Sequence, residues 1–111
     1  MIACTNPAAM APPAGQYSHA AAGGGLVAIA GQVGNRPDGS MAEGLAAQIA
    51  QAFANLETIL AAHGLGMRDV LKLNYFLTSR EDVAVLREVR ARFLPDPPPA
   101  STTIIAALMD E

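Results

Sequence analysis

The chain has 111 residues, with seven basic and ten acidic side chains and a net charge of −3. This length suits one domain that buries roughly 65% of the surface of its unfolded chain. The negative charge argues against a protein that works by neutralising phosphates. The five aromatic residues include no tryptophan, which argues against a stacking surface for single strands. Nucleic acid is therefore not an expected partner.

Cysteine content and hydropathy indicate where the protein resides. Cys4 is the single cysteine, so no intramolecular disulfide can form, and no Cys and His spacing typical of a metal site is present. The N-terminus shows no basic region followed by an apolar run. The longest apolar stretch, residues 20–31, falls well short of the ~20 residues that span a bilayer. We expect a soluble, cytoplasmic protein with no membrane partner and no bound metal.

The N-terminal part of the chain predicts a lead-in followed by a hairpin. Residues 1–14 are rich in Ala and Pro without periodicity, so 1–11 are expected to be irregular with room for one short strand. Short apolar segments at 16–22 and 26–32 predict two antiparallel strands. The three glycines between them supply the positive φ angles of a turn.

A long amphipathic helix is predicted next. Ser40 followed by Glu43 has the spacing of a capping box, and Gly64 is typical of the residue just past a helix end. Apolar residues recur at three and four positions from Leu45 to Leu60, as one buried side of a helix requires. The polar residues of this segment fall on other faces: Gln48, Gln51, Asn55 and Glu57.

The second half predicts strand, helix and strand. Residues 69–78 alternate, with Leu71, Leu73, Tyr75 and Leu77 on one side, as a central strand with one buried face would. A weaker cap at Ser79 opens a second helix that stops at Pro95, and the β-branched residues of 101–108 predict a last strand. The order strand, strand, helix, strand, helix, strand indicates one α+β domain over 1–111 with both helices on one face of the sheet. No glycine-rich phosphate loop precedes either helix.

Several short motifs resemble one known family. Pro13–Ala20 is similar to the segment P-x-G-x-Y-S-x-A of the RidA (YjgF) superfamily, also called the endoribonuclease L-PSP family, and Ala30–Gln32 is similar to its S-G-Q strand. Further positions fall in register, so the resemblance covers roughly residues 12–108: Asn55, Leu56, Val70, Lys72, Arg92, Phe93 and 98–108.

The resemblance implies a fold, an assembly and an activity. The fold would be a chorismate-mutase-like layer sandwich, with a mixed sheet and two helices packed on one face. Members form homotrimers with ligand clefts between subunits, and the founding activity is hydrolysis of reactive enamines and imines. An example is 2-aminoacrylate, which pyridoxal-phosphate enzymes release. No metal or organic cofactor is required, and the ligand is a small molecule.

The resemblance also identifies candidate site residues. Deaminating members carry an arginine just before the Ser that opens the last matched strand, and it holds the substrate carboxylate; Ala100 stands there. A lost charge-assisted hydrogen bond costs ~1.5–3 kcal/mol, or roughly tenfold to a hundredfold in affinity. Tyr17 and Gly31 match ligand-pocket positions, and Thr102 falls where cysteine is common. Tyr17 and Gly31 have an alternative explanation, in which packing and turn geometry alone require them.

Arg87 has two interpretations. It occupies a position where many members carry asparagine near the cleft, so it is a candidate for a relocated anion anchor. Alternatively it is a solvated helix residue, like Arg90 and Arg92, favoured by the helix dipole near a C-terminus. His19 and His63 have no carboxylate that can be named as a partner, and no catalytic residue is assigned.

The end of the chain bears on the choice between functions. The family usually continues into a final strand that carries an acidic residue near the reactive water. This strand is expected to be absent, and Asp110 and Glu111 are too close to the terminus to replace the acid. Three hypotheses follow: a deaminase of altered specificity, a binding protein without hydrolysis, and, disfavoured by charge, a ribonuclease. The sequence favours a RidA-family small-molecule protein whose deaminase activity is lost or redirected.

Overall fold

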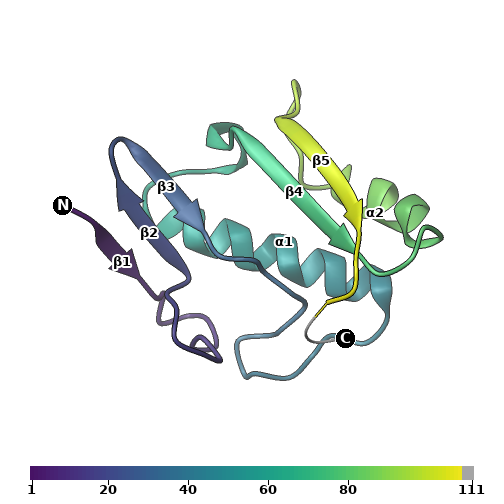
Figure 1. The fold of residues 1–111 in the computed structure, drawn as a ribbon, viewed down its shortest axis with the longest axis horizontal. Helices are drawn as coiled ribbons and strands as arrows, with labels where there is room; N and C mark the ends of the chain where they lie inside the picture. Colours follow the sequence, from purple (N-terminus) through teal and green to yellow (C-terminus); the bar gives the residue numbers. More distant parts are fainter. Residues whose placement is uncertain (109–111) are drawn as a thin grey trace.

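The computed structural model describes residues 1–108 and confirms the α+β class (Figure 1). The strands are β1 (Ala3–Thr5), β2 (Ala20–Gly23), β3 (Leu26–Ile29), β4 (Lys72–Leu77) and β5 (Ala100–Ile105). The helices are α1 (Leu45–Ala62) and α2 (Asp82–Arg90), and a short 3₁₀ turn covers Met67–Asp69. The predicted order is confirmed from β2 to β5, and β1 lies within the predicted lead-in.

The strands pair as two sheets in front of the helices (Figure 1). One is antiparallel with the order β1-β2-β3, and the other consists of β4 and β5 in parallel. The predicted central strand β4 therefore has a strand partner on one edge only, among residues 1–108. The strand β2 begins at Ala20, four residues later than predicted, and the backbone N–H of His19, just before it, donates to Asn6 Oδ1 at 2.8 Å.

The capping box predicted at Ser40 is wrong. The Ser40 hydroxyl donates to Asp38 Oδ1 at 2.6 Å, and its backbone N–H donates to the same oxygen at 2.8 Å. These hydrogen bonds lower the pKa of the Asp38 carboxyl. A serine engaged with the preceding turn cannot cap a helix, since its oxygen no longer faces the first helical N–H groups. The helix α1 begins instead at Leu45 after Gly44, whose φ of 84° suits glycine.

The predicted end of α1 is confirmed. Gly64 has a φ of 71°, and its N–H donates to the carbonyl of Ala61 at 3.0 Å. The N–H of Leu65 reaches the carbonyl of Leu60 at 2.9 Å, which completes a Schellman motif.

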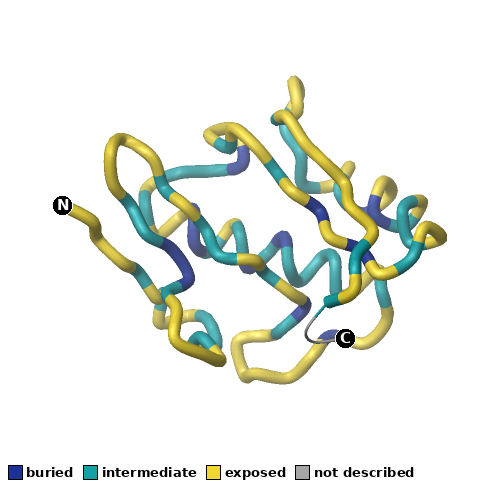
Figure 2. Tube along the Cα trace, in the orientation of Figure 1, coloured by how far each residue is buried: buried dark blue, intermediate teal, exposed yellow. Residues whose placement is uncertain are grey.

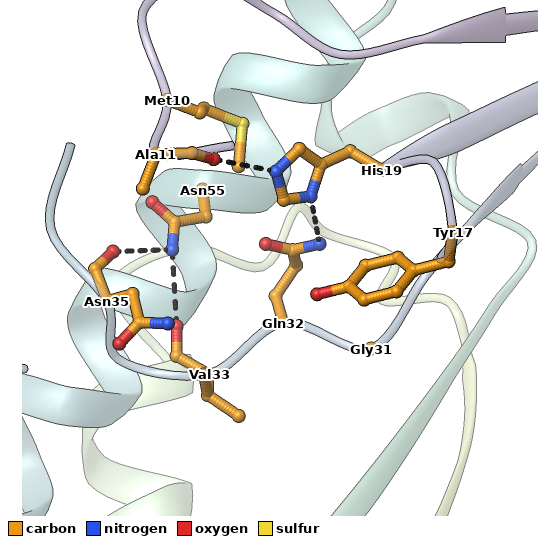
Figure 3. Close-up of a pocket in the computed structure, with 9 residues that line it drawn as sticks. All are labelled: Met10, Ala11, Tyr17, His19, Gly31, Gln32, Val33, Asn35 and Asn55. Atoms are coloured by element: carbon orange, nitrogen blue, oxygen red, sulfur yellow. Dashed lines mark hydrogen bonds between the residues drawn. The ribbon is translucent and has the colours of Figure 1, made fainter. Parts of the chain in front are cut away.

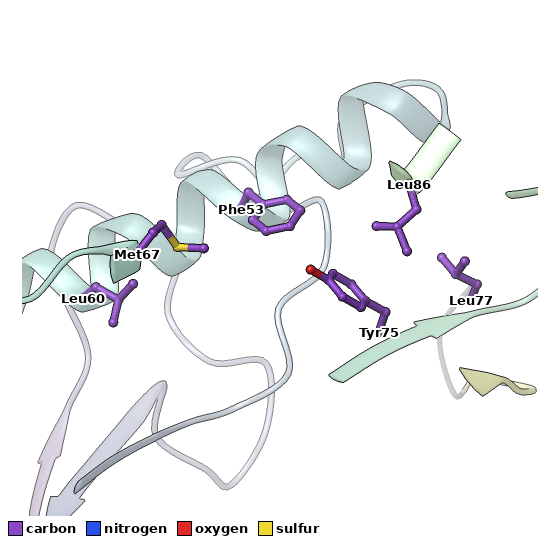
Figure 4. Packing of buried hydrophobic residues seen from close by; sticks show 6 residues of the cluster. All are labelled: Phe53, Leu60, Met67, Tyr75, Leu77 and Leu86. Atoms are coloured by element: carbon purple, nitrogen blue, oxygen red, sulfur yellow. The ribbon is translucent and has the colours of Figure 1, made fainter. Parts of the chain in front are cut away.

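The core lies between α1, β4 and α2 (Figures 2 and 4). Its buried members are Phe53, Leu60, Met67, Tyr75, Leu77 and Leu86. Phe53 stacks on Phe93, with 4.9 Å between ring centroids. The predicted alternation holds for Tyr75 and Leu77, but Leu71 is 73% exposed because it precedes the first paired residue of β4.

The β4–β5 register decides which side chains face the helices. Thr103 pairs with Tyr75, whose side chain points into the core, so Thr103 lies on the helix side. Thr102 pairs with Asn74 and lies on the outer side, where Phe76 is 54% exposed. Side chains one position apart on β5 thus belong to different surfaces.

The hydroxyl of Tyr75 is buried without a hydrogen-bond partner among residues 1–108. Burial raises the pKa of Tyr75, and the positive charge of Arg90 opposes that rise. The neutral phenol is therefore the form that the folded chain favours.

Replacing Tyr75 by Phe is expected to leave the free energy of unfolding unchanged or raise it by about 1 kcal/mol, because an unsatisfied buried hydroxyl is removed. The folded pKa is raised, so above about pH 10 the unfolded state ionises first and stability falls as pH rises. Tyr75→Phe should lack this component. Urea denaturation at about pH 8 and about pH 10.5 measures both effects. The exposed Tyr17→Phe serves as control, and a clear loss of stability in Tyr75→Phe would contradict the expectation.

Candidate functional site

A small hollow lies beside the end of β3, next to α1 (Figure 3). It encloses about 40 Å³, enough for a water molecule or a small part of a ligand. Its lining contains the predicted residues Tyr17 and Gly31 together with Met10, Ala11, His19, Gln32, Val33, Asn35 and Asn55. Two of the four predicted ligand residues are thus brought together.

His19 forms part of the wall and is 7% exposed. Its Nε2 lies 2.9 Å from the carbonyl oxygen of Ala11, which can only accept, so Nε2 carries the proton. Its Nδ1 accepts from Gln32 Nε2 at 3.4 Å, and the same amide donates to the carbonyl of Ala30 at 3.1 Å. Both ring nitrogens are engaged, which makes His19 a structural part of the wall and not a free base.

Asn55 forms the opposite wall and holds the loop after β3 against α1. Its Nδ2 donates to the carbonyls of Asn35 at 2.9 Å and Val33 at 3.2 Å, and its Oδ1 accepts from Gln51 Nε2 at 2.9 Å. Asn55, predicted on a face of the helix other than the apolar one, is buried there, with 6% exposure. Backbone carbonyls of a loop that have no partner on a neighbouring strand need a hydrogen-bond donor when they are buried. The apolar periodicity of the helix does not reveal that need. The match of Asn55 to a position of the family motif was the sequence feature that could indicate a role for this residue.

Tyr17 and Gly31 line the hollow on the same side as Gln32 (Figure 3). The Tyr17 side chain is 49% exposed, and its ring meets that of His19 edge to face with 6.3 Å between centroids. Among residues 1–108, a Cβ added at Gly31 would have no heavy atom within 4 Å, and Gly31 does not adopt a positive φ. Contacts within this part of the chain therefore do not require glycine at position 31.

Arg87 lies in a separate groove between α2 and β5. This open groove has a volume of about 400 Å³ and is lined by Arg80, Val83, Arg87, Arg90, Thr103 and Ile105. It shares no lining residue with the hollow around Tyr17. A single chain thus keeps Arg87 apart from Tyr17 and Gly31.

Thr102 and Ala100 lie on the exposed outer side of β5. The Thr102 hydroxyl oxygen accepts from Lys72 Nζ at 2.6 Å, and Ala100 pairs with Lys72 in the ladder. Thr103, and not Thr102, shares the groove with Arg87.

No carboxylate lines the hollow or the groove within residues 1–108. That part of the chain also has no group of three or more His, Cys, Asp or Glu side chains able to hold a metal ion. No helix there is long and apolar enough to cross a membrane. Asp110 and Glu111, weighed above as replacements for the family's acid, lie outside the described residues.

A family model described as "Endoribonuclease L-PSP" matches residues 8–111. The chain belongs to this family, the RidA family. Its fold agrees with that of RidA from the Antarctic bacterium Psychrobacter, at a TM-score of 0.88 and 38% identity, over 93% of this chain and 85% of that one. The predicted fold and resemblance are confirmed.

Two curated RidA-family relatives are similar in sequence. The protein mmf2, mitochondrial, of Schizosaccharomyces pombe is 37% identical over 93 residues, which cover 83% of this chain and 73% of the relative. A protein of Dermatophagoides farinae named 2-iminobutanoate/2-iminopropanoate deaminase is 35% identical over 94 residues, which cover 83% of this chain and 73% of that relative.

Two glycines beside the hollow should respond differently to alanine. A Cβ at Gly34 would lie 2.7 Å from the backbone Cα of Gln48 in α1, so Gly34→Ala should lower the free energy of unfolding by about 1–3 kcal/mol. Gly31→Ala, the matched control, should change it by less than about 0.5 kcal/mol. Urea denaturation of both variants measures the two changes in the free energy of unfolding. An equal loss of stability in both variants would contradict the close contact of position 34 with α1.

Proposed function

We propose that this RidA-family protein binds a small molecule and that hydrolysis of small amino-acid enamines and imines is lost or redirected. The main support for this proposal is the residue at position 100. Ala100, the first residue of β5, exposes a methyl group where the family resemblance implies the carboxylate-binding arginine. A methyl group offers a substrate carboxylate neither charge nor hydrogen bond.

The cation beside Ala100 supports this proposal. Lys72 pairs with Ala100 across the ladder, yet its amine already donates to Thr102 at 2.6 Å. An ammonium is also a point charge and cannot reproduce the two parallel hydrogen bonds of a guanidinium. Lys72 is therefore a poor substitute for the expected arginine.

The proposed ligand residues are Tyr17, Gly31, Arg87 and Thr102. Tyr17 would supply an aromatic wall, Gly31 an uncovered backbone, Arg87 a charge and Thr102 a hydroxyl. In one chain they lie on separate surfaces, so we propose a homotrimer in which neighbouring subunits complete the cleft. Gly31, which no contact with the described residues 1–108 requires to be glycine, supports a close approach from outside. No metal or organic cofactor enters this proposal.

The alternative is an active deaminase of altered specificity. It is supported by the name of the Dermatophagoides farinae relative at 35% identity. Its substrates would be imines that lack a carboxylate, or that place one against Arg87. Ribonuclease activity is less well supported, because the net charge is −3 and His19, the single His in the hollow, has both nitrogens engaged.

We also propose that the protein is cytoplasmic and that neither a membrane nor a nucleic acid is its partner. Support comes from the single cysteine, which lies exposed on β1, and from the acidic balance of the chain.

A coupled assay tests the loss of deaminase activity. A pyridoxal-phosphate dehydratase generates 2-aminoacrylate, and the decay of its absorbance is followed with and without the protein. Wild type should accelerate the decay little, and Ala100→Arg should act about tenfold or more faster because a bidentate carboxylate contact is gained. Ala61→Arg, at an exposed position at the end of α1, controls for added charge. Strong acceleration by wild type would favour the alternative.

Light scattering at micromolar concentration tests the shared cleft. The expected mass is that of three chains, since the ligand residues of one chain lie on separate surfaces. A monomeric mass would exclude a cleft between subunits.

A further inference from the structure

The groove between α2 and β5 has a sequence pattern of its own. Arg80, Val83, Arg87 and Arg90 are spaced by three, four and three residues, which places them along one side of the α2 segment. The apolar residues Leu86 and Val89 lie on another side of the helix and are buried. The side of α2 that faces β5 is therefore mainly cationic, where a helix over a sheet ordinarily presents apolar groups.

Strand β5 forms the other wall of the groove. The register that puts Thr103 beside Tyr75 and Ile105 beside Leu77 turns both side chains toward the helices. Thr103 and Ile105 are nevertheless exposed, and both line the groove. The groove thus has guanidinium groups on one wall and a hydroxyl and an apolar side chain on the other.

Positive charge is concentrated in this groove although the whole chain is acidic. Four of the seven basic residues fall between positions 80 and 92, and three of them line the groove: Arg80, Arg87 and Arg90. Within residues 1–108, no carboxylate is among the lining residues. Several guanidinium groups on one wall make the groove a candidate site for an anionic ligand.

Arg90 is partly held in position. It is half-buried, and its guanidinium carbon lies 5.4 Å from the centroid of the Tyr75 ring, within cation–π range. Tyr75 belongs to the core, so one of the three cations is fixed to a rigid element. A charge that is already oriented loses less conformational entropy when it binds.

We propose that this groove binds a small dianion of the phosphate-ester class. Planar guanidinium groups match phosphate oxygens through paired hydrogen bonds, and three of them with the Thr103 hydroxyl offer more donors than one carboxylate accepts. The volume of about 400 Å³ suits a small organic molecule, and Val83 and Ile105 offer apolar contact to its carbon part. The inference rests on the proposed function in that Arg87 faces a ligand.

The test uses inorganic phosphate as the probe and reads binding, so it can fail independently of deaminase activity. The melting temperature of the full chain is measured with phosphate at about 10 mM and with acetate at equal ionic strength. Phosphate should raise the melting temperature of wild type clearly more than acetate. Arg87→Gln and Arg80→Gln should each weaken phosphate binding about tenfold or more, measured by calorimetry.

Arg92→Gln is the matched control, because it removes the same charge from the same segment outside the groove. It should bind phosphate as wild type does, and Thr103→Val should bind several-fold more weakly. Phosphate also stabilises proteins through exclusion from their surface. An equal shift in wild type, Arg87→Gln and Arg92→Gln would therefore overturn the proposal, as would no shift in wild type.

Discussion

The packing of α1 against both sheets is the contact on which the rest of the structure depends. The two sheets are not paired with each other within residues 1–108, so no backbone ladder fixes their relative position. Phe53 and Leu60 on α1 pack with Tyr75 and Leu77 of β4, and Ile29 of β3 joins the same cluster. Side-chain packing around one helix, and not strand pairing, therefore sets where the hollow lies relative to the groove.

Asn55 extends this role of α1 from the core to the candidate site. Its side-chain amide donates hydrogen bonds to the carbonyls of Val33 and Asn35, as a neighbouring strand would otherwise do. These bonds hold the loop that closes the hollow. The same loop passes so close to α1 that a Cβ at position 34 would lie 2.7 Å from the Cα of Gln48. One polar side chain and one absent side chain thus give the hollow its shape, while His19 and Gln32 complete its wall through their mutual hydrogen bond.

The chemistry that this arrangement supports follows from what surrounds each surface. Within residues 1–108, the hollow offers hydrogen bonds and an aromatic edge without a carboxylate, which suits recognition more than proton transfer. The groove presents positively charged arginine side chains, whereas Ala100 presents no charge. Family membership supplies the fold, and the residues at these positions decide which member functions are supported. The hollow around Tyr17 and the cationic α2 groove are the two features on which the proposal of a ligand with an anionic group at α2 rests.

The sequence by itself determined the α+β class, the order of elements, the end of α1 at Gly64 and the RidA resemblance. These follow from local patterns: apolar periods of 3.6 and 2, a glycine with positive φ and short contiguous motifs. Only the tertiary structure decided that Ser40 serves a turn, that Asn55 is buried and that Thr102 and Arg87 lie on different surfaces. The physical reason is that these outcomes depend on partners distant in sequence. A donor is buried where a remote loop needs it, and strand register, which no local pattern reveals, sets the side of the sheet on which each residue lies.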